Sequence, residues 1–235
     1  MPNTVSLENS GQTATDPGFV TTAVSFIQDG GPFMYPIMVV LAVGLAISIE
    51  RIIYLQVTKI RNKKIWNAVF PYVSKGQFRQ ALEVSKNSNT GVGKIITYGL
   101  ERSRTAKRND DVELAMEEGL MEITPRLEAR TPYIGTLANI ATLLGLLGTI
   151  LGLIQAFTAV ASADPAQKAD LLSASISVAM NTTAFGLMSA IPLLLLYAFI
   201  NAMTSKLSDS MEMATVKFLN IFRQAASQQE RSQEG

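Results

Sequence analysis

The chain has 235 residues, and its 20 Lys and Arg against 19 Asp and Glu leave a formal net charge of +1, which gives no argument for nucleic-acid binding. It lacks cysteine, which excludes disulfides and thiolate sites, and it lacks histidine, the commonest transition-metal ligand and the usual proton shuttle at neutral pH. No phosphate loop, metal-ligand set or nucleophile constellation is present, so we expect no enzyme, no catalytic residues, no metal and no cofactor.

Residues 1–31 are predicted to form a polar tail followed by a short amphipathic helix. Residues 1–18 contain no Lys or Arg, whereas a secretory signal peptide would begin with a basic region that leads into an apolar core. Between residues 19 and 27 the apolar side chains fall on one side of a helix. This pattern suits a helix that lies on the membrane surface.

Residues 32–55 are predicted to form the first transmembrane helix. The stretch from 30 to 49 is free of charge, and Pro36 falls in the opening turns, where its missing N–H costs least. Glu50 and Arg51 follow at the far end. We interpret them as interfacial charges that pair or snorkel. A functional role for Glu50 is the alternative, because an ionisable group near a membrane core is often functional.

Residues 56–131 are predicted to form a helical cytoplasmic domain, because they carry 14 Lys and Arg against 9 Asp and Glu. The N-terminal 32 residues have no Lys or Arg. The positive-inside rule therefore places the N-terminus outside the cell and this domain inside.

Within this domain the apolar periodicity predicts helices at 77–86 and 92–100. A third helix is expected to begin with a capping box, in which Asp110 is the cap and Glu113 reaches back to it. It is expected to run on into the second membrane span, with Pro125 and Pro132 allowing bends.

Two long charge-free stretches follow, at residues 131–163 and 171–205. Each exceeds the ~20 apolar residues that a helix needs to cross a bilayer. They predict transmembrane helices at 132–160 and 171–200, joined by a periplasmic connector at 161–170. The chain is thus expected to be an all-α membrane protein with three transmembrane helices, the second and third long and extending into the cytoplasm.

Residues 201–235 are predicted to extend the third helix into the cytoplasm and to end in a disordered tail from Gln228. An apolar seam with 4-3-4-3 spacing follows this extension: Leu207, Met211, Ala214, Phe218 and Ile221. The seam fits either a contact between subunits or packing against the chain's own helices, and both alternatives stay open.

Each long span carries a stripe of small residues. The first stripe has 3-4-3-4 spacing: Ala138, Ala141, Gly145, Gly148 and Gly152. The second has 4-3-4-3 spacing: Ser175, Ala179, Thr182, Gly186 and Ser189. Small residues let helix backbones approach closely, which is how helices associate in lipid. The stripes predict tight helix packing, with Gly145, Gly148, Gly152 and Gly186 at the contact.

Two hydroxyls are predicted to lie at one depth in the membrane. Thr149 precedes the connector by 12 residues and Thr183 follows it by 13, so at ~1.5 Å per residue both lie at nearly the same level. The candidate ion-pathway residues are the polar ones around this level: Thr149, Thr183, Asn181, Thr182 and Thr142. Helix packing and an ion path explain them equally well. Neither span contains a titrating side chain, so a proton relay here needs a carboxylate from a partner helix.

Two motifs in these spans resemble the MotA/TolQ/ExbB family. Residues 144–152 read LGLLGTILG, similar to the second-span motif of that family. Residues 183–192 read TAFGLMSAIP, similar to its third-span motif. The layout of three spans, with a cytoplasmic domain between the first two, resembles the ExbB/TolQ branch, since MotA-type subunits have four spans.

The resemblance implies the ring-forming subunit of an ion-driven motor in the bacterial inner membrane, which couples the flow of H+ or Na+ to mechanical work on the cell envelope. It implies a homopentamer around two single-span ExbD/TolR-like partners, whose membrane aspartate carries the ion opposite Thr149 and Thr183. The resemblance implies no nucleic-acid partner. The alternative is a non-conducting membrane scaffold or transporter subunit, in which the small stripes serve packing alone.

One position departs from the family pattern. Many ExbB/TolQ proteins have a glutamate five residues before the position of Thr183, where this chain has Val178. Asn181, Thr182 and Thr183 make the site uncharged and rich in hydroxyls. The coupling ion is therefore left open between H+ and Na+, because hydroxyl and carbonyl oxygens suit sodium.

Overall fold

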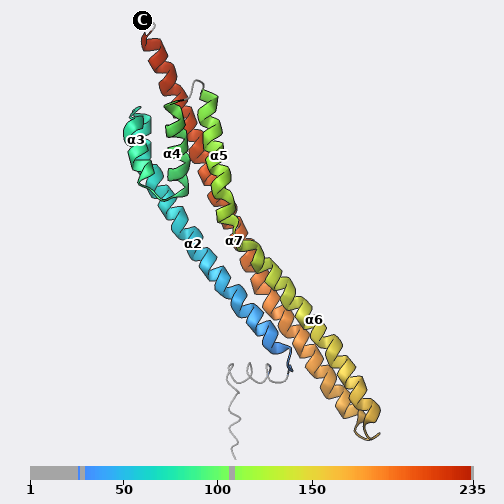
Figure 1. Ribbon diagram of the computed structural model, residues 1–235. Coiled ribbons are helices and arrows are strands. Elements are labelled where there is room, and N and C mark those ends of the chain that lie inside the picture. The colour runs from blue at the N-terminus through green and yellow to red at the C-terminus, as the bar shows by residue number, and fades with distance from the viewer. Residues whose placement is uncertain (1–25, 27–29, 106–108, 234–235) are drawn as a thin grey trace, which may run out of the picture.

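The computed structural model describes Phe26, residues 30–105 and residues 109–233. These residues form an elongated, all-helical molecule (Figure 1). The order is α2 (Met34–Ser74), α3 (Phe78–Lys86), α4 (Gly91–Ser103), α5 (Asn109–Glu128), α6 (Thr131–Ser162) and α7 (Lys168–Gln233). The surface helix expected at 19–27 lies outside the described residues, except for Phe26.

Three helices are long and apolar enough to cross a membrane, as the sequence predicts. They are α2, the combined stretch of α5 and α6, and α7 as far as Ala225. Helices α6 and α7 lie side by side and antiparallel, and α2 packs against both of them (Figure 1). The protein is therefore a multi-pass membrane protein with three candidate spans.

Helix α2 continues well beyond the expected span and leads into the polar part of the chain. It ends in a Schellman motif. Gly76 adopts a φ of +71°, its N–H donates to the Val73 carbonyl at 3.0 Å, and the N–H of Gln77 donates to the Tyr72 carbonyl at 2.8 Å. The turn at Gly76 sends α3 back along α2, which begins the helical domain.

The helical domain consists of α3, α4, α5 and the parts of α2 and α7 that pack on them. Its core contains large, fully buried side chains, among them Ile95, Leu100, Met116 and Phe218. The seam on α7 is part of this core: Leu207, Met211, Ala214 and Phe218 are buried in it, and Ile221 packs against it. Packing against the chain's own helices therefore accounts for the seam.

The third helix of this domain does not run unbroken into the second span. Helix α5 ends at Glu128, and α6 begins at Thr131 after a turn at Arg130, whose φ of +66° is left-handed. Pro125 lies inside α5 without ending it. Pro132 explains the break, because it has no N–H and its ring clashes with the carbonyl four residues earlier, that of Glu128.

The expected capping box at the start of α5 also differs from what is found. The described part of the helix begins at Asn109, next to residues that the structure does not describe. The carboxylate of Glu113 accepts a hydrogen bond from Arg223 of α7 instead of reaching back to the cap. At the other end of the chain, α7 continues to Gln233 and so includes part of the segment expected to be disordered.

Candidate functional site

The backbones of α6 and α7 meet at their glycines. A methyl group added to Gly186 would lie 2.8 Å from the Ala141 carbonyl oxygen and 2.9 Å from the Gly145 Cα. One added to Gly145 would lie 3.2 Å from the Gly186 Cα. Only residues without a side chain allow this approach, so these two glycines mark the closest point between the helices.

The other two predicted packing glycines lie further along the same contact. A methyl group on Gly152 would lie 3.0 Å from the Ala179 Cβ, and one on Gly148 would overlap the Thr182 side chain. From Ala138 onward, the buried positions of α6 are all alanine or glycine. The stripe inferred from spacing is thus the face that α6 turns toward its neighbours.

Thr183 lies at this contact and links the two helices. Its Oγ1 donates a hydrogen bond across to the Gly145 carbonyl at 2.9 Å. In an α-helix that carbonyl also accepts from the N–H of residue 149, so the Thr183 hydroxyl lies beside the backbone of Thr149. The two threonines do not bond each other, since Oγ1 of Thr149 donates to the Leu146 carbonyl at 2.7 Å.

The three other predicted polar residues have different surroundings. Thr182 is buried, and its hydroxyl lies 2.7 Å from the Gly30 carbonyl and 2.9 Å from the Val178 carbonyl. Thr142 donates to the Ala138 carbonyl at 3.2 Å. Asn181 is half-buried and has no hydrogen bond within the described residues. Two positions along a helix are about 200° apart, so Asn181 lies on nearly the opposite side of α7 from Thr183.

This arrangement can supply oxygen atoms to an ion but cannot supply a titrating group. Thr183 and Thr149 are both partly exposed, and the Gly145 carbonyl lies between them. No Asp, Glu, Lys or Arg occurs in α6 or between residues 171 and 205 of α7. Among the described residues no group of acidic side chains could hold a metal ion.

The sequence pattern of the MotA/TolQ/ExbB proton channel family matches residues 87–213, which is more than half of the 235 residues and includes all of the α6–α7 contact. The chain belongs to the MotA/TolQ/ExbB proton channel family. The family is one of channels, which agrees with the expectation that the chain is not an enzyme.

The individual relatives include proteins named as ExbB and a protein named as TolQ. An ExbB homolog from the archaeon Methanothermobacter thermautotrophicus is 30% identical over 196 residues, covering 83% of this chain and 67% of the relative. The Tol-Pal system protein TolQ of Haemophilus influenzae is 31% identical over 127 residues, covering 50% of this chain and 55% of TolQ. The biopolymer transport protein exbB1 of Vibrio cholerae is 49% identical over 53 residues, 23% of each chain.

Sequence reasoning missed the polar contacts that join α2 to the junction between α5 and α6. Arg51 is buried, donates to the Leu127 carbonyl near the end of α5, and lies 4.9 Å from the centre of the Tyr54 ring. Glu50 pairs with Arg130, at 3.4 Å. The two neighbouring charges therefore bind other helices rather than each other. Their place at the end of a span is visible in the sequence, but their partners are not.

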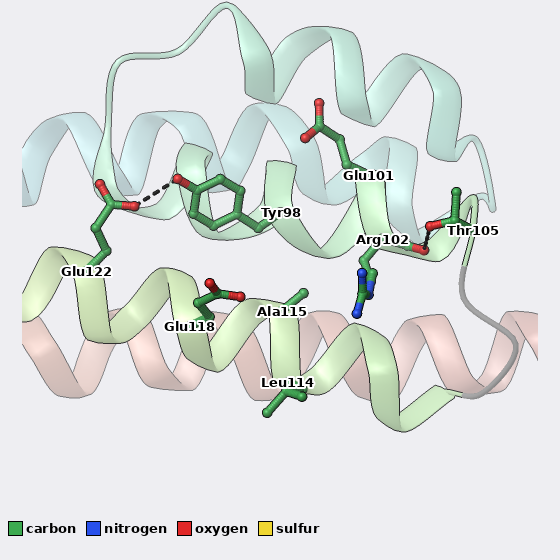
Figure 2. Close-up of a pocket in the computed structure, with 8 residues that line it drawn as sticks. All are labelled: Tyr98, Glu101, Arg102, Thr105, Leu114, Ala115, Glu118 and Glu122. Carbon is green, nitrogen blue, oxygen red and sulfur yellow. Dashed lines mark hydrogen bonds between the residues drawn. The ribbon is translucent and has the colours of Figure 1, made fainter.

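One groove of this channel-family chain is far from the glycine contact. It has a volume of about 610 Å³ and lies between α4 and α5 in the helical domain (Figure 2). Glu101, Glu118 and Glu122 line it, and Tyr98 donates to Glu122 at 2.8 Å. This hydrogen bond raises the pKa of Tyr98 above its ordinary value. The groove contains none of the predicted ion-pathway residues.

Proposed function

We propose that this chain is the ring-forming subunit of an ion-driven motor in the cytoplasmic membrane, which couples H+ or Na+ flow to mechanical work on the cell envelope. The observation that carries the proposal is the incomplete site on α6 and α7. Hydroxyl and carbonyl oxygens lie together there at mid-span, yet a proton relay through a membrane needs a group that titrates. A partner that brings a carboxylate completes the site.

The partner that fits is an ExbD/TolR-like protein with one span and one membrane aspartate. Its carboxylate would take or release the ion beside the Thr183 hydroxyl and the partly exposed Thr149. Thr182 and Thr142 extend the proposed polar path, and Asn181, on the other side of α7, would join it only where a neighbouring copy or the partner packs on that side. With Val178 in place of a glutamate, the chain's own contribution is oxygen ligands alone. Hard cations such as Na+ prefer such ligands, so Na+ remains a coupling ion beside H+.

A ring of several copies is the assembly that this geometry favours. In the most apolar window of each candidate span, only 22%, 22% and 28% of the residues are buried within one chain. A pair of antiparallel helices cannot enclose a path, so neighbouring copies and the partner helix must supply the other walls. We propose a homopentamer around two partner helices, and native mass spectrometry of the purified complex measures this stoichiometry.

The proposed orientation places the N-terminus and the 161–170 connector outside, and the helical domain and the C-terminus in the cytoplasm. Basic side chains follow the predicted first span within α2, including Lys59, Arg61, Lys63 and Lys64, and such clusters stay on the cytoplasmic side. Labelling of single cysteines placed in the connector and in the α2–α3 turn tests this orientation.

The proposed site is tested by Thr183→Val, with Thr183→Ser as the matched control. Valine keeps the shape of threonine but removes the hydroxyl, whereas serine keeps the hydroxyl. The chain is co-purified with its single-span partner and reconstituted in liposomes, where uptake of H+ and of ²²Na+ is measured under a membrane potential. We expect Thr183→Val to lower uptake at least tenfold with the oligomer intact, and Thr183→Ser to keep most of it.

Other outcomes would favour the scaffold or transporter alternative. Wild-type uptake in the valine variants of both Thr183 and Thr149 would contradict the coordinating role. Failure of any single-span protein with a membrane aspartate to co-purify would contradict the motor itself and leave the glycine stripes as packing surfaces only.

A further inference from the structure

A small cavity is lined by residues of α2, the start of α4 and the end of α5. Its volume is about 250 Å³, which is below the ~300–1,000 Å³ of sites for drug-sized ligands. The cavity belongs neither to the proposed ion path nor to the contact between the membrane spans, because it lies in the helical domain beside the predicted membrane boundary.

The cavity is lined by three cations and, among the described residues, by no carboxylate. Arg61 comes from α2, Lys94 from α4 and Arg126 from α5. Arg126 pairs with Glu122 at 2.8 Å, but Arg61 and Lys94 form no ion pair within the described part of the chain. The cavity therefore holds an excess of positive charge, in contrast to the acidic groove of Figure 2.

The start of α4 adds a favourable field at the same place rather than free donors, because Val92 N–H donates to Asn62 Oδ1 at 3.4 Å and Gly93 N–H donates to Thr90 Oγ1 at 3.1 Å. Helix α4 begins at Gly91, which lines the cavity, and the positive end of a helix dipole favours anions. Asn62 also lines it and is only 4% exposed. Its amide nitrogen has just the Met211 sulfur as a partner, at 3.4 Å, and a thioether is a weak acceptor. A buried amide is thus left with donor capacity at the cavity wall.

The depth of the cavity relative to the membrane indicates which anion it meets. Arg61 lies six residues beyond the predicted end of the first span at residue 55, or ~9 Å along the helix. Arg126 lies six residues before the predicted start of the second span at residue 132. A head-group layer occupies ~5–7 Å on each side of the hydrocarbon core, so the backbone of these residues lies just beyond that layer and their long side chains reach back into it. Tyr54, which also lines the cavity, is the kind of residue found at that interface.

We propose that this cavity is a binding site for a phosphate group at the head-group level of the membrane. Arg61 and Lys94 supply the unpaired charge, the Asn62 amide supplies a hydrogen-bond donor, and the start of α4 supplies the positive end of a helix dipole. The same chemistry admits the phosphodiester of an anionic phospholipid or a free phosphate ion. The site bridges α2, α4 and α5, so an occupied cavity would hold the helical domain against the membrane surface.

The test uses the full-length chain in a neutral detergent with two probes. Binding of phosphatidylglycerol, with phosphatidylcholine as reference, is measured by native mass spectrometry, and binding of inorganic phosphate by equilibrium dialysis. The variant is Arg61→Gln with Lys94→Gln. Its matched control is Lys63→Gln with Lys64→Gln, which removes the same charge from exposed positions next to the cavity.

A cation near an anionic surface contributes about 1 kcal/mol, or roughly fivefold in affinity. We therefore expect the cavity variant to lose ~25-fold in affinity for the bound probe and the control variant to lose far less. If the cavity variant loses phosphatidylglycerol binding, the ligand is a lipid head group. If it loses only phosphate binding, the ligand is a free phosphate ion. Either result supports the site.

Equal losses in the two double variants would overturn the proposal, because they would reflect general surface charge. Absence of binding of both probes to the wild-type chain would overturn it as well. If the cavity variant unfolds at a lower temperature, its loss of binding could come from a loss of structure. Binding is then measured for the charge-preserving variant Arg61→Lys with Lys94→Arg. Retained binding in that charge-preserving variant supports the site, and lost binding with an unchanged fold contradicts it.

Discussion

The α6–α7 pair and the helical domain bury opposite kinds of side chain. In the domain, large apolar residues such as Phe218, Met116 and Ile95 are inside. In the helix pair, along α6 from Ala138 onward and along α7 up to Ala190, the buried residues are small, while large residues such as Leu143 and Leu146 are more than half exposed. One chain therefore follows two packing rules.

The difference follows from the solvent that each region meets. In water, burial of apolar area drives association, by about 25 cal/mol per Å². Lipid tails are as apolar as leucine, so in a membrane the close approach of backbones takes over that role. The domain should therefore be sensitive to the removal of atoms, and the helix pair to their addition.

The largest effect is expected from Phe218→Ala in the domain. Phe218 is fully buried and stacks on Phe222 at 6.2 Å between ring centres. Its truncation should lower the free energy of unfolding of the domain by about 3–5 kcal/mol. Urea titration of the full chain in detergent measures this through Trp66, the chain's one tryptophan, which packs against the same core. Met213→Ala, at a position 55% exposed on the same helix, should change it little.

In the helix pair, Gly186→Ala should be destabilising although alanine is the better helix former. The added methyl group would meet the Ala141 carbonyl and the Gly145 Cα, which belong to the backbone and cannot rotate away. We expect a loss of about 1–3 kcal/mol, measured by SDS titration followed by circular dichroism. Ala184→Val adds more volume at an exposed position two residues away. If that control costs as much as Gly186→Ala, backbone contact is not what the glycine provides.

Sequence reasoning captured what depends on periodicity and missed what depends on tertiary contacts. The three spans follow from long runs of apolar residues. The glycine stripes follow from residue spacings that match the helical repeat. The same depth for Thr149 and Thr183 also follows, because both count residues from one connector. Hydrogen-bond partners do not follow from the sequence, since residue spacing cannot show that the Thr183 hydroxyl bonds the Gly145 carbonyl rather than Thr149.

The break at Arg130 illustrates the second limit. Pro125 and Pro132 look equivalent in the sequence, yet α5 contains the first and ends before the second. The chain ends α5 with a left-handed turn before Pro132 and continues the helix through Pro125, and contacts with α2 join the junction. The pairs Arg51–Leu127 and Glu50–Arg130 do so from a helix about 80 residues earlier in the chain.

The smallest effect is expected from Tyr98→Phe, which tests whether an exposed polar contact contributes to the domain. The hydrogen bond to Glu122 raises the pKa of Tyr98, so it favours the protonated phenol in the folded state. Its contribution is therefore complete below the ordinary tyrosine pKa of ~10 and is lost as the pH rises through the folded-state value. Because the pair is exposed, we expect less than about 1 kcal/mol. Thermal midpoints of the wild type and the variant should differ slightly at pH 8 and converge above pH 10. A difference that stays constant across this range would mean that the phenol contributes by packing rather than by its bond to Glu122.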